Sequence, residues 1–87
     1  MLIGVSIKET KLKTAEMVKV LRKREKLSQE QLAMRLNLSR ITIKNLEAGK
    51  NATLDTLFKV LQYFDLLQSF ADLVDRETGQ QDYDSIY

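Results

Sequence analysis

Four side chains within one short stretch are suited to recognising the edges of DNA bases. Arg40 can donate two hydrogen bonds to one guanine, Asn45 can pair with adenine, and Ile41 can contact the methyl group of thymine. Lys44 can donate to a base or to a phosphate. The pattern predicts that residues 40, 41, 44 and 45 read bases. Two alternatives stay open, because Arg40 could bind a phosphate and Ile41 could pack against the neighbouring turn.

Polar side chains around this stretch are suited to the DNA backbone. Hydroxyl, amide and ammonium groups donate hydrogen bonds to phosphate oxygens, and the first turn of a helix favours an anion. The predicted phosphate contacts are Gln29, Ser39, Thr42, Lys50 and Asn51. For Ser39 the alternative is a role as a helix cap alone.

Charge is unevenly divided along the 87 residues. Between Lys8 and Lys50 the chain has twelve Lys and Arg against five Asp and Glu, a net charge of +7, whereas residues 51–87 carry −5. A basic half suits a polyanion, because Lys and Arg at phosphates release condensed counterions. A solvated helix face would give the same pattern. The acidic half is unsuited to the same phosphates.

The composition excludes most catalytic and metal chemistry. There is no cysteine and no histidine, so disulfides, thiol nucleophiles, imidazole bases and the usual zinc ligands are all absent. Carboxylates such as Glu47, Asp55 and Asp65 are not accompanied by a nucleophile with its base or by a glycine-rich phosphate loop. We therefore expect no enzymatic activity, no metal and no cofactor.

The base-reading stretch needs helices to position it, and a first helical signal precedes it. Ser28 and Gln31 have the spacing of a capping box, which predicts a helix that begins at Gln29. Asn37 can end this helix, because Asn tolerates the left-handed conformation better than any residue except Gly.

A second helix should carry the base-reading residues themselves. Ser39 is placed to cap a helix that runs from Arg40 to about Ala48, and Gly49 is its natural C-cap. Ile43 and Leu46 are the expected core-facing pair. The remaining side chains of this helix should then share the exposed arc.

Three further helices are expected around this pair. The first is capped by Thr14 and runs to about Lys26, with Met17, Val18 and Leu21 on its apolar side. Another is capped by Thr53 and has a clean apolar stripe formed by Leu54, Leu57, Phe58, Leu61 and Phe64. After Asp65, a shorter helix is apolar on more than one side.

Residues 29–49 resemble the Cro/C1-type, or XRE-type, helix-turn-helix of phage repressors and bacterial regulators, and a looser resemblance extends from about Thr14 to Phe64. It implies an all-α, five-helix, lambda-repressor-like DNA-binding domain with the helix-turn-helix at its second and third helices. In this family an Arg of the first helix and a Glu of the third commonly form an ion pair, and Arg22 and Glu47 occupy those positions. The chain departs from the family pattern in having Asn37 where Gly is most frequent.

One reading helix covers only about four base pairs, so we expect a homodimer on a palindromic operator, with half-sites about 34 Å apart. The predicted dimer surface consists of Leu66, Leu67, Phe70, Leu73 and Val74. The alternative is that these residues close the core of the monomer.

The two ends of the chain differ from the domain at residues 14–75. Residues 1–13 form an arm or a short strand, in which Leu2 or Ile3 would alternate with Val5 and Ile7; a disordered start is the alternative. Residues 76–87 should form a flexible, polar, acidic tail, which either folds onto a basic partner or stays solvated.

These features favour a sequence-specific, double-stranded DNA-binding regulator, most simply a repressor. Residues 52–64 also resemble a segment of antitoxins from kinase-type toxin-antitoxin modules, so a toxin protein is an alternative partner. A protein-interaction module without DNA binding is a third class. The apolar start is too short for a signal peptide or a membrane span, so we expect a cytoplasmic protein with no membrane contact.

Overall fold

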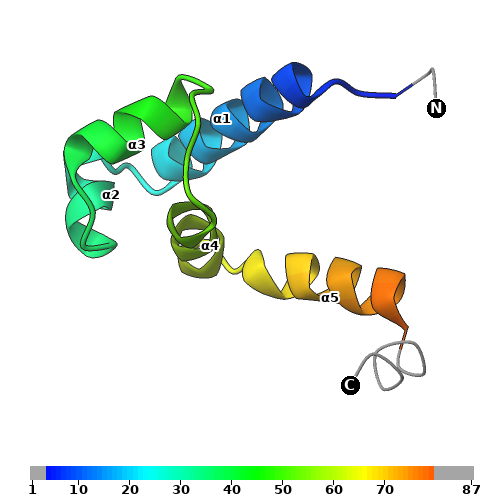
Figure 1. Ribbon diagram of the computed structural model, residues 1–87. Helices are drawn as coiled ribbons and strands as arrows, with labels where there is room; N and C mark the ends of the chain where they lie inside the picture. Colours follow the sequence, from blue (N-terminus) through cyan, green and yellow to red (C-terminus); the bar gives the residue numbers. More distant parts are fainter. Residues whose placement is uncertain (1–3, 80–87) are drawn as a thin grey trace.

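The computed structural model describes residues 4–79, which form five helices and no strand (Figure 1). The helices are α1 (Ile7–Arg24), α2 (Gln29–Arg35), α3 (Arg40–Glu47), α4 (Leu54–Tyr63) and α5 (Leu67–Thr78). The prediction of an all-α, five-helix domain is confirmed.

Hydroxyl side chains cap the first four helices in the same way. Ser6, Ser28, Ser39 and Thr53 each accept a hydrogen bond from the backbone N–H three residues later, at 3.0 to 3.1 Å. At α2 the capping box is complete, because Gln31 Oε1 accepts from the backbone N–H of Ser28 at 2.8 Å. The three caps predicted at Ser28, Ser39 and Thr53 are confirmed.

The predicted cap of the first helix at Thr14 is wrong, because the observed cap is Ser6, eight residues earlier. Thr14 lies inside α1, and its hydroxyl donates to the carbonyl of Thr10 at 2.7 Å instead of capping. Ile7 is therefore helical, which contradicts the alternating strand at this residue; Val5 lies in the irregular segment before the cap. Leu2 and Ile3 lie outside the described residues.

Helices α1 to α4 end in one shared geometry. The residues just past them are left-handed, with φ of 58° at Lys26, 55° at Asn37, 75° at Gly49 and 61° at Asp65. At each end the next residue's N–H bonds five residues back, as in Leu38 to Ala33 O at 2.8 Å. This geometry confirms that Asn37 and Gly49 end their helices, as predicted. It also shows that α1 ends at Arg24, whereas the prediction placed its end at about Lys26.

The core lies where α1, α2, α3 and α4 meet. Its fully buried side chains come one from each helix: Val18, Leu32, Ile43 and Val60. The core side of α1 is formed by Ala15, Val18 and Arg22, so Met17 is exposed and its predicted place on the apolar side is wrong. Both α1 and α2 pack against α3, which fixes the orientation of the helix that carries the predicted reading residues.

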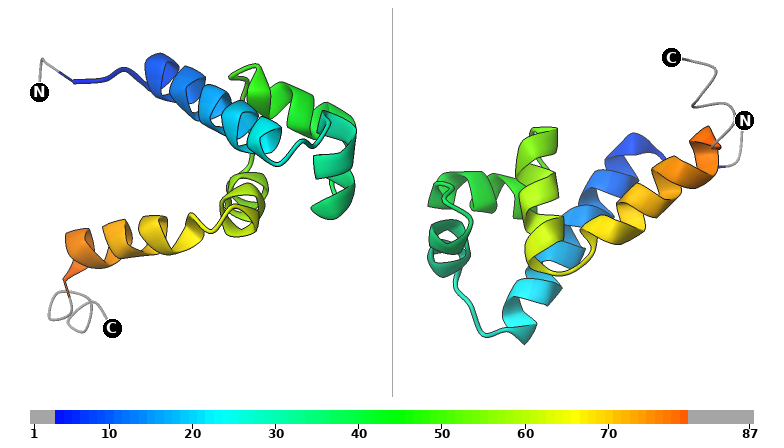
Figure 2. Two further views of the ribbon diagram at one scale, coloured as in Figure 1. Left: turned by 180° about the vertical axis from the view of Figure 1, so that it is seen from behind. Right: turned by 90° about the horizontal axis from the view of Figure 1, so that it is seen from below.

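Helix α5 projects from this core (Figures 1 and 2). None of its residues is buried, and its contact with α4 includes the rings of Phe58 and Phe70, whose centroids are 5.0 Å apart. The radius of gyration is 15.2 Å, whereas a compact chain of this length would have about 12 Å. With 12 residues, α5 is longer than α4, contrary to the sequence expectation.

The carboxyl end of α5 also shortens the predicted tail. Because the helix continues to Thr78, residues 76–78 are helical and not part of a flexible segment. Gly79 follows the helix, and residues 80–87 of the predicted tail lie outside the described residues. Across residues 4–79, no helix combines the length and the apolar character that crossing a membrane requires.

Candidate nucleic-acid interface

Helix α3 has one buried side and one exposed side. Ile43 and Leu46 face the core, as predicted, whereas Arg40 and Lys44 are exposed on the outer side. Ile41 has 67% of its surface exposed, so it does not pack against the turn. The structure thus brings three of the four predicted reading residues together on one open face.

Asn45 lies at the border of this face and is half-buried. It lines a shallow hollow between α3, the following loop and the start of α4, together with Thr42, Asn51, Ala52, Thr53 and Thr56. The carboxamide of Asn45 is therefore flanked by the loop, and no hydrogen bond between residues 4–79 engages its side chain. Its amide remains available to a base.

A buried ion pair fixes the carboxyl end of α3 to α1. Arg22 Nε donates to Glu47 Oε2 at 2.6 Å, and Arg22 Nη2 donates to Glu47 Oε1 at 2.8 Å. Arg22 Nη1 also donates to the carbonyl of Leu27 at 2.8 Å, which ties in the connection between α1 and α2. The pair that the resemblance implied is present, and it orients α3 without taking part in the exposed face.

The environment of the pair shifts both titrations toward the charged forms. The hydrogen bond to Glu47 raises the pKa of Arg22 above its ordinary value, although burial opposes this shift. Burial raises the pKa of Glu47, but the hydrogen bonds from Arg22 and Gln29 and the charge of Arg22 outweigh it, so this pKa lies below its ordinary value. The carboxylate at the end of α3 is thus held charged.

Gln29 has a second role that sequence reasoning missed. Its Nε2 donates to Glu47 Oε1 at 3.1 Å, so the first residue of α2 is bonded to the last residue of α3. Sequence alone gave no signal for this contact, because it joins two helix ends 18 residues apart. A phosphate contact by Gln29 stays a prediction. It would have to be made by the backbone N–H of Gln29 or by the second hydrogen of its side-chain amide.

Ser39 and Thr42 combine capping with an available donor. Ser39 Oγ accepts from the N–H of Thr42 at 3.1 Å and lies 2.8 Å from Thr42 Oγ1. One of the two hydroxyl hydrogens bridges the pair, so the other is left to bond outward. The predicted phosphate contacts at these residues are therefore compatible with the cap.

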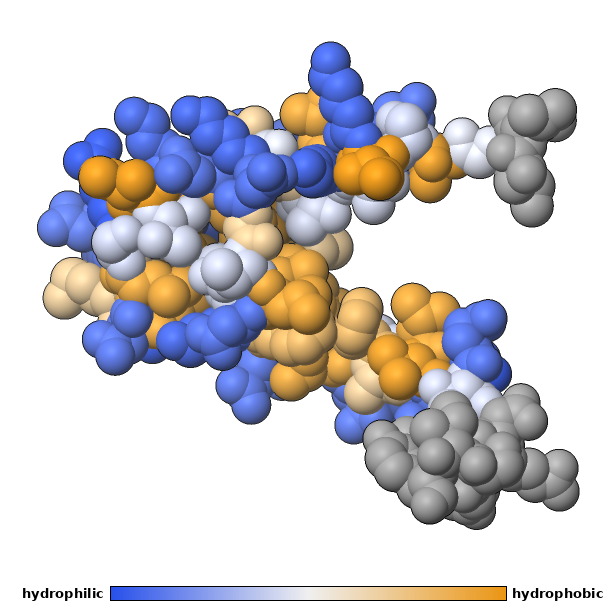
Figure 3. Space-filling view, in the orientation of Figure 1, coloured by the Kyte–Doolittle hydropathy of each residue, from blue (hydrophilic) through white to orange (hydrophobic). Residues whose placement is uncertain are grey.

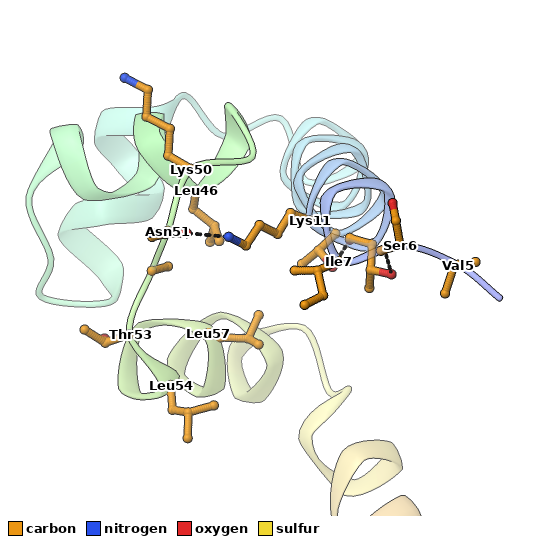
Figure 4. A pocket seen from close by; sticks show the side chains of 13 residues that line it. Val5, Ser6, Ile7, Lys11, Leu46, Lys50, Asn51, Thr53, Leu54 and Leu57 are labelled. Carbon is orange, nitrogen blue, oxygen red and sulfur yellow. Dashed lines mark hydrogen bonds between the residues drawn. The ribbon is translucent and has the colours of Figure 1, made fainter. Parts of the chain in front are cut away.

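The loop after α3 carries the remaining predicted phosphate contacts. Lys50 is exposed and follows the left-handed Gly49, and Asn51 is also exposed. The Nζ of Lys11 on α1 donates to Asn51 Oδ1 (Figure 4), which leaves the amide hydrogens of Asn51 free to bond. Sequence reasoning missed Lys11, which sits 40 residues from its partner.

The site offers binding groups and no evident metal site. Within residues 4–79, no group of three His, Cys, Asp or Glu side chains is arranged to hold a metal ion. The arrangement presents guanidinium, ammonium, amide and hydroxyl donors on one side of α3 and its loop. Donors of this kind, on a protruding helix, can bond to base edges and phosphates.

Comparison with protein families gives one match. A family model described as helix-turn-helix matches residues 18–67, a segment from the middle of α1 to the first residue of α5. No curated protein and no solved structure matches the chain. The matched segment contains the buried pair and every predicted base and phosphate contact.

Proposed function

The chain belongs to the Cro/C1-type helix-turn-helix family of DNA-binding transcription regulators, and from this premise we propose that it is a dimeric repressor that binds a palindromic operator. In this proposal α3 lies in the major groove and α2 spans the backbone. The proposed function is DNA binding without catalysis, in the cytoplasm.

The observation that carries the proposal is the division of α3 into two sides. Ile43, Leu46 and Glu47 anchor the helix in the core, so its opposite side is presented on a rigid support. That side carries Arg40, Ile41 and Lys44 with no partner among the described residues that would conceal them. Rigid presentation matters, because a flexible reading helix would lose affinity to ordering entropy.

Phosphate contacts would complete the docking. Ser39 and Thr42 lie at the amino end of α3 and Lys50 and Asn51 beyond its carboxyl end. Donors at both ends of a reading helix can hold the two backbones that border one major groove. This arrangement supports the predicted roles of Arg40, Ile41, Lys44 and Asn45 as the base-reading set.

The dimer is proposed from α5. We call the surface formed by Leu66, just before α5, and by Leu67, Phe70, Leu73 and Val74 of α5 the α5 face. Leu73 and Val74 are 43% and 46% exposed, and no residue of the helix is buried. The alternative, that these residues close the monomer core, fits poorly with a helix that projects away from that core. Apolar surface of this kind is typical of a dimer interface.

One pair of measurements tests the proposed function. Selection from random double-stranded DNA should enrich a palindrome whose half-sites are about one helical turn apart, roughly 34 Å. The affinity for that site should fall linearly in log salt, because several phosphates are neutralised. A protein-interaction module would enrich no sequence. Enrichment of a single, non-repeated half-site would contradict the dimeric part of the proposal.

A role as an antitoxin is the second candidate, and it is compatible with repression. Its support is the resemblance of residues 52–64, which include all of α4, to the corresponding segment of kinase-type antitoxins. A toxin would have to bind a surface that leaves α3 free. Purification of the tagged protein from its native cell tests this candidate: a kinase-like partner in stoichiometric amount supports it, and purification without a partner argues for a simple repressor.

A further inference from the structure

A cavity that the DNA-binding proposal does not use lies between the start of α1, the loop after α3, and α4. Its volume is about 410 Å³, and Figure 4 shows Ile7 of α1 and Leu57 of α4 on opposite walls of it. Its apolar lining, which we call the α1–α4 groove, consists of Val5, Ile7, Leu46, Ala52, Leu54 and Leu57.

Residues 4–79 do not fill this groove. Val5, Ile7 and Leu54 are 64%, 76% and 66% exposed. In Figure 3 the surface is hollowed between the start of α1 and α5, with apolar side chains on the lower side of the opening. Clustered exposed apolar side chains often mark an interaction site, so the groove can receive an apolar segment that residues 4–79 do not supply.

Charge restricts what this occupant can be. No carboxylate lines the cavity, and its charged lining residues are Lys11 and Lys50. Ile7, Lys11 and Thr14 lie on one side of α1, Lys8 borders that side, and Glu9 lies on the opposite side of the helix. The occupant should therefore be an apolar segment bordered by acidic residues.

The α5 face has the composition that the groove requires. Leu73 and Val74 are its exposed apolar residues, and Glu77 follows them by four and three residues on the same side of the helix. Residues 67–78 carry Asp72, Asp75 and Glu77 against one Arg. None of these carboxylates is in an ion pair within residues 4–79. The helix is apolar at its centre and acidic at its end.

We propose that the α1–α4 groove binds the α5 face of a second copy of this chain. In a twofold dimer each copy provides one groove and one α5 face, so the same contact forms twice and covers both grooves and both α5 faces. Leu73 and Val74 of one copy fill the groove, and Glu77 approaches Lys8 and Lys11 of the other. This inference rests on the dimer of the proposed function and assigns its contact surfaces.

The arrangement has a consequence for DNA binding. The groove is lined in part by Asn51 and Ala52, which belong to the loop that carries the predicted phosphate contacts. A partner helix in the groove would contact that loop and stabilise its conformation. Dimerisation and phosphate binding are then coupled through the same six-residue connection between α3 and α4, residues 48–53.

The absence of cysteine from the sequence permits a clean crosslinking test. One copy carries Ile7→Cys or Leu54→Cys with a first tag, and the other carries Val74→Cys with a second tag. The two are mixed, oxidised and separated under denaturing conditions. A disulfide forms only if the two Cα atoms approach within about 7 Å. The matched control replaces the groove cysteine with Met34→Cys, on the exposed side of α2.

A disulfide between the two differently tagged copies, formed with either groove cysteine and not with Met34→Cys, is the expected result. Disulfides only between two Val74→Cys copies would overturn the inference and indicate pairing of α5 with α5. A dimeric mass without the mixed disulfide would overturn it as well. A monomeric mass for the unmodified chain would contradict the proposed dimer. DNA selection would still show separately whether α3 reads DNA.

A second variant checks the same contact without oxidation. Ile7→Asp places a carboxylate in the groove, next to the Glu77 expected from the partner, and should raise the dimer dissociation constant roughly tenfold or more. Met34→Asp, an equally exposed site, should leave it unchanged. Circular dichroism confirms that both variants fold. Equal effects of the two variants would contradict the proposed groove contact.

Discussion

Arg22 and Glu47 form two parallel hydrogen bonds between α1 and α3, at 2.6 and 2.8 Å. Gln29 adds a third bond to the same carboxylate, so one buried group joins three helices. Buried pairs contribute little net stability, because desolvation offsets attraction, but loss of one partner leaves a charge unpaired. The pair therefore specifies how α3 sits on the domain more than how stable the domain is.

Loss of the Glu47 carboxylate should destabilise the fold. Glu47→Ala leaves the buried guanidinium of Arg22 without its partner, and we expect a loss of about 3–5 kcal/mol in the free energy of unfolding. Urea denaturation at pH 7 measures it. Glu30→Ala is the control, because Glu30 is exposed and makes no ion pair within residues 4–79. A loss below about 1 kcal/mol would show that the pair is solvated.

The depressed pKa of Glu47 also predicts how stability depends on pH. The folded state holds this carboxylate charged below the ordinary value of 4.5, so its contribution is complete above that pH and is lost as pH falls through the lower, folded pKa. Glu47→Gln should flatten this part of the pH profile, measured by urea denaturation from neutral pH into acid. Parallel profiles for the two proteins would contradict the prediction.

The start of α1 can be tested with two hydroxyl residues. Ser6→Ala removes the observed cap and should cost about 1 kcal/mol locally, seen as faster hydrogen exchange at the amide of Glu9. Thr14→Ala should not speed this exchange, because Thr14 lies inside the helix and Ala is a better helix former. The reverse order of effects would restore Thr14 as the cap.

These residues also show which features were predictable from sequence. Caps at Ser28, Ser39 and Thr53 follow from contacts three residues apart, so local spacing was sufficient. The same spacing at Ser6 and Glu9 could have located α1, but the alternating apolar residues before it suggested a strand. These apolar residues are also compatible with the start of a helix. Ile7 is exposed, so its position is not restricted by the periodicity of a buried helix face.

Long-range contacts were less predictable for a physical reason. The pair of Arg22 and Glu47 came from a family resemblance, whereas the bonds from Gln29 to Glu47 and from Lys11 to Asn51 depend on how helices pack and leave no local pattern. The projection of α5 was also not predictable. An apolar stripe is the same whether a helix packs on its own core or on a second copy.

A stability gain is expected at the end of α1. Lys26 is left-handed, a conformation that strains any residue with a Cβ, so Lys26→Gly should stabilise the domain by about 1 kcal/mol. Lys13→Gly, in the middle of α1, should instead destabilise it by about 1 kcal/mol. Thermal denaturation of both variants checks the prediction. Destabilisation by Lys26→Gly would mean that its side chain makes a contact of its own.

Loss of a phosphate contact should weaken binding to all DNA sequences alike. Lys50→Ala removes one exposed ammonium from the loop, so affinity should fall by a similar factor for selected and random sites. The slope of log affinity against log salt should decrease by about 0.9. Lys59→Ala on α4, where Lys59 pairs with Asp55 at 3.4 Å, is the control and should leave the slope unchanged. A change in sequence preference with Lys50→Ala would assign it to base reading.

Loss of a base contact should have the opposite signature. Arg40 is exposed in the first turn of α3, and its guanidinium can donate two hydrogen bonds to one guanine. Arg40→Ala should relax preference at one position in each half-site, with a loss of about 1–3 kcal/mol on the preferred base and little on the others.

Repeating the DNA selection with Arg40→Ala and with Arg40→Lys separates the two roles of this residue. Lysine keeps the charge but lacks the planar fork, so a base-reading Arg40 predicts relaxed preference in both variants. A phosphate-binding Arg40 predicts near-normal behaviour with lysine and a uniform loss with alanine. Unchanged preference in both variants would leave Lys44 and Asn45 as the hydrogen-bonding readers, and the operator would then be specified from the second turn of α3 onward.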